Sequence, residues 1–415
     1  MPLTPRSAFQ ISHLTDHIFR TTYYNPLYIR DVILLGPDGP IGRSLRIRGE
    51  RIVAIDAPPR KNDRVIDGQG RLLLPGLINA HDHLELNTFR RLKYRETYTH
   101  SRQWIEDIED RFGSDPALVE PREQPLADRI WVGVLKNVLS GVTTVCHHNP
   151  LHKSLRRSHP IRVVKNYGFC HSLFRGEDTM TSYLKTKPDW PWIIHLAEGV
   201  DAEAAAEFDR LDRLGALQRN TVLVHGVGLT ANQRQALIER GGGLIWCPGS
   251  NNFLFGQTAC VQELAQSGKL ALASDSRLSG EFDLLTELRV AGDTGQLTPQ
   301  CLFQSVTGNA ARLLRLQEKG LGQIAIGGVA DFLMLAPPQT TDYFSNLLDL
   351  RRGQIELVML GGKPLVGSPE LQSLFSATQT KFTPVWVDEI RKLMSAALAA
   401  RLKKCSVQEP GLVLK

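Results

Sequence analysis

The alternation of apolar and polar positions predicts β structure at both ends of the chain. From Tyr28 to Ile55, short apolar runs separated by turn residues indicate a small antiparallel β unit. The segments 321–337 and 355–366 have the same β-rich, glycine-punctuated pattern. Because they flank a long central region of different character, we expect the two ends to pair into one small β-sandwich.

The central region, residues 76–330, alternates apolar strand-like runs with amphipathic helical stretches. This pattern predicts parallel strands joined by crossover helices, and one α/β barrel uses about 250 residues. We therefore predict an α/β fold with one barrel of the TIM type, which needs eight strands to close. Seven strands are clear, and the eighth is expected within 171–191. The seven are LINAHDH (77–83), VTTVCHH (142–148), RVVKNYGFC (162–170), WIIHLAE (192–198), TVLVHG (221–226), GLIWCPGS (243–250) and LALASDS (270–276).

Two helices are predicted from apolar residues at helical spacing. The first covers 126–141 and ends at Gly141. The second starts at Thr383 and Pro384 and continues to Lys404, as a docking helix. The predicted domains are the N-terminal part of the sandwich (1–75), the barrel (76–330), the C-terminal part of the sandwich (331–366) and a C-terminal helical extension (367–415).

Composition narrows the class of protein. With 42% apolar and 22% charged residues, the chain is an ordinary globular one. The six cysteines are scattered without a CxxC pair, and no signal-peptide pattern opens the sequence. The apolar runs are too short to cross a bilayer, and the net charge of +6 is dispersed. We expect a cytoplasmic protein that binds neither membrane nor nucleic acid.

Residues able to bind a metal follow four of the predicted strands. His81 and His83 are two apart on one strand, so both rings face the barrel interior while Asp82 faces outward. His195, His225 and Asp275 end three further strands. In a barrel these strand ends form the active-site face. Neutral imidazoles with a carboxylate are ligands that zinc and similar ions prefer. His81, His83, His195 and Asp275 are therefore the predicted metal ligands.

The motifs PGLINAHDH, HLAEG, VHGVGL, CPGSN and LASDS, in this order after a short β segment, resemble the amidohydrolase superfamily. The similarity is greatest to its metal-dependent deaminases and chlorohydrolases, the group of cytosine, guanine, adenosylhomocysteine and triazine hydrolases. It covers roughly residues 28–366. The resemblance implies a distorted (β/α)8 barrel, a β-sandwich built from both termini, and one divalent metal. It also implies that Glu198 and His225 act on the substrate.

These residues suggest a mechanism. A divalent metal, expected to be Zn²⁺ with Fe²⁺ or Mn²⁺ as alternatives, gives a hydroxide nucleophile near neutral pH. Asp275 can take the proton of the water, Glu198 can protonate the ring nitrogen or leaving group, and His225 can orient the nucleophile and the oxyanion. The expected activity is hydrolysis of a C–N bond other than a peptide bond, by deamination of an aminated N-heterocycle.

Two alternatives remain open at this point. The same chemistry could open a cyclic amide or an imidazolone-type ring, or the chain could be a non-catalytic scaffold with this fold. A second metal would require a carboxylated lysine, and Lys165 lies early in its strand. One metal is therefore favoured over two.

The substrate pocket is less well defined by the sequence. Glu85, His148 and His171 lie close after predicted strands and are candidates for substrate binding, and His147 lies beside them. Basic loops would favour an anionic small-molecule substrate. Enzymes of this build are commonly dimers, so we expect a homodimer. The basic residues are Arg90, Arg91, Lys93 and Arg95 after the first strand, and Lys153, Arg156 and Arg157 after the second.

Overall fold

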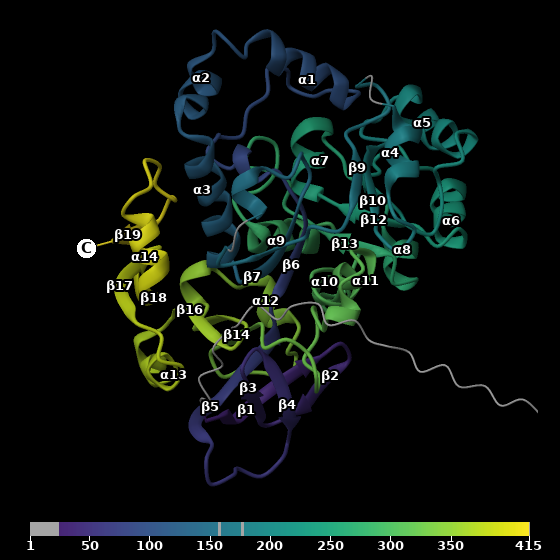
Figure 1. Ribbon diagram of the computed structural model, residues 1–415. Helices are drawn as coiled ribbons and strands as arrows, with labels where there is room; N and C mark the ends of the chain where they lie inside the picture. The colour runs from purple at the N-terminus through teal and green to yellow at the C-terminus, as the bar shows by residue number, and fades with distance from the viewer. Residues whose placement is uncertain (1–24, 157–158, 176–177, 415) are drawn as a thin grey trace, which may run out of the picture.

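The computed structural model describes residues 25–156, 159–175 and 178–414. Residues 1–24 of the predicted N-terminal domain therefore lie outside the described part. The described strands form an eleven-stranded sheet, a five-stranded sheet and a three-stranded sheet. In Figure 1 the strands β1–β5 of the large sheet lie below the two smaller sheets, and the C-terminal segment lies to one side, in yellow.

The large sheet joins the two ends of the chain. Strand β1 (Leu27–Gly36) lies parallel to β5 (Arg64–Pro75), and β5 pairs antiparallel with β14 (Phe332–Leu335). The N-terminal and C-terminal β segments thus pair, as the sequence pattern predicted. Eight further strands extend this sheet: β2 (Gly39–Gly42), β3 (Leu45–Arg48), β4 (Arg51–Ile55), β15 (Leu357–Leu360), β16 (Lys363–Gly367), β17 (Phe382–Val387), β18 (Ile390–Ser395) and β19 (Leu412–Leu414).

The predicted docking helix from 383 to 404 is wrong over most of its length. The chain forms the hairpin β17 (Phe382–Val387) and β18 (Ile390–Ser395), then the short helix α14 (Ala396–Leu402) and the strand β19 (Leu412–Leu414). The apolar spacing was misleading because β18 is buried along four successive residues. Asp388 and Glu389 both have positive φ angles, 48° and 68°, which form the tight turn without an Asn-Gly signal.

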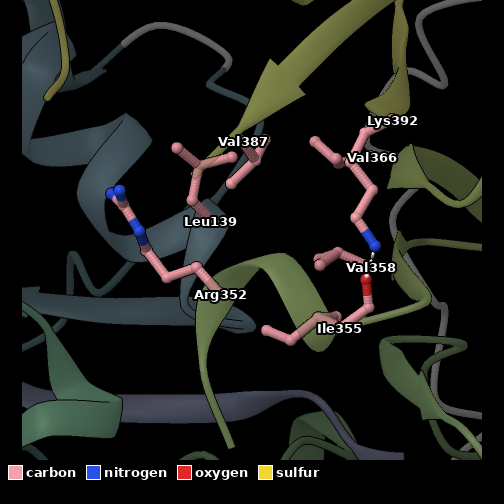
Figure 2. Close-up of a pocket in the computed structure, with 7 residues that line it drawn as sticks. All are labelled: Leu139, Arg352, Ile355, Val358, Val366, Val387 and Lys392. Carbon is pink, nitrogen blue, oxygen red and sulfur yellow. Dashed lines mark hydrogen bonds between the residues drawn. The ribbon is translucent and has the colours of Figure 1, made fainter. Parts of the chain in front are cut away.

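The C-terminal hairpin is anchored on the rest of the protein by a buried lysine. Lys392 of β18 is 2% exposed, and its Nζ donates to the Ile355 carbonyl (2.7 Å) and to Ser368 Oγ (3.0 Å). Figure 2 shows this amino group and its bond to Ile355 beside a small cavity that Leu139 and Val387 also line. The C-terminal segment is therefore packed against the core, not attached as a separate extension.

The central region contains eight strands among the described residues, all pairing in parallel. The predicted strand 162–170 is two strands, β8 and β9, which explains why only seven were predicted. The expected eighth strand within 171–191 is a wrong prediction, since the described part of that interval holds helix α4 (Thr179–Lys185). The eight are β6 (Leu77–Asp82), β7 (Val142–His147), β8 (Arg162–Val163), β9 (Gly168–Cys170), β10 (Trp192–Leu196), β11 (Thr221–His225), β12 (Gly243–Trp246) and β13 (Leu270–Leu272).

These eight strands follow chain order within two sheets, β6 to β8 and β9 to β13. Among the described residues no backbone ladder joins the two sheets. Side chains connect β6 with the end of β13, because Asn79 Oδ1 accepts from Ser274 N (3.1 Å) and Asn79 Nδ2 donates to Ser274 Oγ (2.8 Å). The arrangement brings the first and last strands of the region together.

Helices cover the outer sides of these strands. Helix α3 (Leu126–Leu139) matches the prediction for 126–141, and Figure 1 shows α4, α5 and α6 outside β9 to β12. In the described residues no helix has the length and apolar character of a membrane span. The other helices are α1 (Ser101–Asp110), α2 (Pro116–Glu123), α5 (Ala202–Arg213), α6 (Ala231–Glu239), α7 (Pro248–Phe255), α8 (Gln262–Gln266), α9 (Leu284–Asp293), α10 (Pro299–Ser305), α11 (Gly308–Leu313), α12 (Ser345–Leu348) and α13 (Gln372–Ala377), with the 3-10 turns η1 (Leu84–Leu86), η2 (Lys153–Arg156), η3 (Gln317–Lys319), η4 (Arg352–Gln354) and η5 (Pro369–Leu371).

The burial of Lys392 predicts a pH dependence of stability. Burial lowers the pKa of its amino group from 10.5 to about 8. Between these two pH values the unfolded chain holds a proton that the folded chain has released, so the free energy of unfolding rises with pH. We expect Lys392→Met to remove this part of the rise, measured by urea unfolding from pH 7.5 to 10. The exposed Lys363→Met is the control; equal slopes in the two variants would contradict the prediction.

Candidate metal and catalytic site

The carboxyl ends of the barrel strands gather histidines and a carboxylate in one buried cluster. His81 and His83 lie at the end of β6, His195 is in β10, and Asp275 follows β13. The Nε2 atoms of His81 and His195 are 3.2 Å apart. Asp275 Oδ1 lies 3.7 Å from His81 Nε2 and 3.6 Å from His83 Nε2. The structure thus brings the four predicted ligands together.

Each of these three separations is close to the spacing of two ligand atoms on one small cation. Ligand atoms at tetrahedral positions 2.0–2.1 Å from zinc would be about 3.3 Å from one another. The ligand atoms form two groups that share His81, each with all its ligand atoms within 4.8 Å: His81 with His83 and Asp275, and His81 with His148 and His195. His148, which we predicted to bind substrate, therefore lies among the candidate ligands.

The protonation states of the imidazoles also suit a metal. Burial lowers the pKa of His81, His148 and His195 well below the ordinary value, and the neighbouring histidines lower each further. The rings are therefore neutral. His195 Nδ1 donates to the His171 carbonyl (2.8 Å), so the lone pair of His195 lies on Nε2, which faces His81. Neutral imidazoles and a carboxylate are the donor set expected for zinc, so these residues fit a divalent metal.

Asp275 is held as an ionised carboxylate. Its Oδ2 accepts from Ser250 Oγ (3.1 Å) and Ser279 Oγ (2.8 Å), and its Oδ1 accepts from Ser276 N (2.8 Å). Burial acts to raise the pKa of Asp275, but the nearby His83 and His225 and these hydrogen bonds outweigh it, so the pKa is lowered. The carboxylate is thus available at neutral pH.

Glu198 and His225 form a second element of the site. His225 Nε2 lies 3.4 Å from Glu198 Oε1, and His225 Nδ1 donates to Asn251 Oδ1 (2.9 Å). Asn251 Nδ2 in turn donates to Thr258 Oγ1 (3.1 Å), which fixes the orientation of the amide. Burial raises the pKa of Glu198 above its ordinary value, although His225 opposes the shift. The site therefore holds two carboxyl groups whose pKa values are shifted in opposite directions, down for Asp275 and up for Glu198.

The backbone at this face is strained. His225 and Asp275 have positive φ angles, 73° and 51°, and so does Ala197, directly after β10, at 53°. Such a conformation costs a non-glycine residue about 1–3 kcal/mol. Ala197 is held there by its N–H, which donates to Glu207 Oε2 (2.7 Å). Strained residues at the ends of β10, β11 and β13 are typical of a site that fixes side-chain directions for function.

A buried lysine supports the site from the helical layer. Lys136 of α3 is 0% exposed and its Nζ lies 3.3 Å from Asp82 Oδ2. The same Nζ donates to Asn87 Oδ1 (2.7 Å) and to the Asp275 carbonyl (3.0 Å). Asp82 faces α3, where Asn137 Nδ2 also donates to its carboxylate (2.8 Å). The ammonium group of Lys136 thus connects Asp82, at the end of β6, with Asp275, which follows β13.

The other residues predicted for the pocket have different surroundings. The rings of His148 and His171 lie 4.3 and 4.8 Å from that of His195. Glu85 lies 3.7 Å from His147 Nδ1 and 4.0 Å from His152 Nε2. The nearby His152, His147 and His83 outweigh the effect of burial and lower the pKa of Glu85 to about 2.

The predicted basic loop is largely committed to protein contacts. Arg91 pairs with Glu281 (2.7 Å), and Arg95 pairs with Asp107 (2.7 Å). Lys93 Nζ donates to the Phe253 carbonyl (2.8 Å). Arg157 of the second loop lies outside the described residues. These contacts give no support to an anionic substrate, which stays a prediction.

The sequence did not reveal every residue that shapes the site. Asn251 and Ser250 lie in the motif CPGSN, but their roles depend on helix α7 beginning at Pro248 and turning both side chains toward His225 and Asp275. Lys136 was hidden because it lies on the apolar face of a helix, where a lysine gives no sign of its partner. Only the distance between α3 and the strand ends identifies its role.

Comparisons with known proteins agree with the motifs. Residues 191–365 match the model of the amidohydrolase family. The chain is 24% identical over 426 residues to a 5'-deoxyadenosine deaminase of Methanobrevibacter smithii, covering 84% of this chain and 94% of that protein. It is 26% identical over 383 residues to a 5-methylthioadenosine/S-adenosylhomocysteine deaminase of Moorella thermoacetica, covering 75% and 86%. The predicted resemblance to the amidohydrolase superfamily is confirmed.

Solved structures support the fold. An adenosine deaminase from Xanthomonas campestris with bound zinc matches with a TM-score of 0.66 and 18% identity, covering 85% of this chain and 97% of that one. An atrazine chlorohydrolase from Arthrobacter aurescens complexed with zinc matches with a TM-score of 0.66 and 17% identity, covering 85% and 99%. These matches show an α/β fold of the TIM-barrel type.

The buried contact between Lys136 and Asp82 leads to a stability prediction. Lys136→Met leaves the Asp82 charge buried without its cation, which we expect to lower the free energy of unfolding by about 3–5 kcal/mol. Urea unfolding at pH 7 measures the loss. The double variant Asp82→Asn, Lys136→Met carries no unpaired charge and should be less destabilised than Lys136→Met. A cost below about 1 kcal/mol for the single variant would show that the pair is unimportant.

Proposed function

We propose that this protein is a metal-dependent hydrolase of C–N bonds other than peptide bonds, and that it deaminates an aminated N-heterocycle. One observation carries the proposal: a buried cluster of neutral imidazoles and an ionised carboxylate lies beside a carboxyl group, Glu198, whose pKa is raised. Two carboxyl groups with opposite pKa shifts in one site are suited to separate base and acid roles. The related deaminases named above favour the same reaction.

His81, His83, His195 and Asp275 would hold one divalent metal, for which we propose zinc. The bound ion would supply an activated water molecule near neutral pH, because it lowers the pKa of that water from 15.7 toward about 7. Asp275 would accept the proton from this water, since its carboxylate is ionised and two serine hydroxyls fix its position.

Glu198 would act as the general acid. Burial raises its pKa, which favours its acting as a proton donor to a ring nitrogen as the carbon becomes tetrahedral. His225, fixed by Asn251, lies beside Glu198 and would orient the water and the developing oxyanion. Asp275 would then pass its proton to the amino group, which would leave as ammonia as the C–N bond breaks, and the proton of the added hydroxyl would return to Glu198.

The substrate class can be narrowed from the relatives. We propose an adenine-containing nucleoside, because the curated relatives are named as deaminases of 5'-deoxyadenosine, 5-methylthioadenosine and S-adenosylhomocysteine. His148 and His171 would border the substrate. We also propose that the two strand groups close into a complete (β/α)8 barrel, that the terminal β segments form a sandwich beside it, and that the protein is a cytoplasmic homodimer.

Ammonia release from a substrate panel tests this function. The zinc-loaded protein is assayed with 5'-deoxyadenosine, 5'-methylthioadenosine, S-adenosylhomocysteine and an amino-triazine, and we expect ammonia from at least one nucleoside. Glu198→Gln should keep its metal but lower kcat about 100- to 10,000-fold, because the general acid is lost. The exposed Glu203→Gln, on the following helix, is the matched control and should be fully active.

Metal removal is a separate prediction. Treatment with a chelator should abolish ammonia release, and zinc should restore it. His195→Ala should lose both the metal of this site and the activity, measured by elemental analysis and by the same assay. Ring opening without ammonia would point to a cyclic amide as substrate. No activity in a zinc-loaded protein on either substrate class would favour a non-catalytic scaffold.

A further inference from the structure

A second cluster of metal-binding side chains lies next to the site described above and shares none of its residues. Glu85, His147 and His152 each place one ligand atom so that all three atoms lie within 4.8 Å of one another. Glu85 Oε2 is 3.7 Å from His147 Nδ1, and Glu85 Oε1 is 4.0 Å from His152 Nε2. These distances are too long for hydrogen bonds but typical of groups that surround a cation.

Each member of the cluster has a buried polar atom without a hydrogen-bond partner among the described residues. These atoms are Glu85 Oε2, His147 Nε2 and His152 Nε2. A buried polar atom that makes no hydrogen bond costs stability, and several in one place indicate a missing water or ion. The His147 side chain is completely buried, so it cannot satisfy this nitrogen with bulk solvent.

The surrounding contacts position these side chains for a ligand. Asn149 Nδ2 donates to Glu85 Oε1 (2.5 Å), and the Leu84 N–H donates to His147 Nδ1 (3.3 Å). An acceptor Nδ1 carries the lone pair of the ring, and Nδ1 is also the His147 atom that lies 3.7 Å from Glu85 Oε2, so Nδ1 is the nitrogen that would bind the ion. The side chain of His152 is 28% exposed, which gives an ion a path from solvent.

We propose that Glu85, His147 and His152 form a second divalent-metal site, distinct from the catalytic cluster. Two imidazoles and one carboxylate are a donor set that zinc uses, and they leave a fourth position for water. Glu85 lies in the 3-10 turn η1 after β6, His147 is the last residue of β7, and His152 belongs to the loop between β7 and η2. The ion would therefore connect the loop that holds His152 with the turn η1, next to the catalytic site.

Zinc content of the full-length protein tests the proposal. Every variant carries Cys260→Ser, because the exposed Cys260 thiol could bind zinc by itself. Protein stripped with a chelator is reloaded with zinc, dialysed and analysed for zinc per chain. With both sites present we expect about two zinc ions per chain, and about one in either His152→Ala or His195→Ala. The double variant should bind none. His159→Ala, which changes a histidine outside both clusters, should retain both ions.

The outcomes separate this proposal from the proposed function. Loss of one zinc in His195→Ala but none in His152→Ala would leave the catalytic site intact and overturn the second site, whose orphaned atoms would then bind water only. Loss in His152→Ala alone would support the second site and overturn the first. If His152→Ala fails to fold, as judged by circular dichroism, Glu85→Gln replaces it with the same expectations.

Discussion

The contact between the first and last strands of the central region is the constraint on which the site depends. Asn79 and Ser274 exchange two hydrogen bonds across 195 positions of the sequence. Without this contact the imidazoles of His81 and His83 would not lie beside Asp275. Lys136 strengthens the same connection from the helical layer, since one amino group contacts Asp82 and the carbonyl of Asp275.

The site also depends on burial, which has opposite effects on its members. The imidazoles become neutral and offer lone pairs, and Glu198 tends to keep its proton. Asp275 stays ionised because hydroxyl groups and histidines compensate for the loss of water around it. A divalent metal held by these residues would supply a positive charge, which the neutral imidazoles do not carry. The fold thus prepares a base, an acid and a set of ligands in one enclosed volume.

The sequence revealed the strand ends but not the connections between distant elements. Apolar runs ending in His81, His195, His225 and Asp275 were readable because a buried parallel strand has a strong local pattern. The sequence did not predict that 162–170 divides into β8 and β9, because strands of two and three residues are too short to show an alternation of apolar and polar residues. The C-terminal hairpin was missed because a strand buried on both faces imitates helical spacing. Lys136 and Asn251 act through tertiary contacts that no local pattern encodes.

The most direct test of the account is a crystal structure of the zinc-loaded protein with anomalous diffraction at the zinc edge. We expect a strong anomalous peak about 2.0–2.2 Å from the imidazole nitrogens of His81, His83 and His195 and from a carboxylate oxygen of Asp275. If no peak lies among these four residues in protein that has bound zinc, the strand ends do not form a metal site; a second peak between Glu85, His147 and His152 would not change that conclusion.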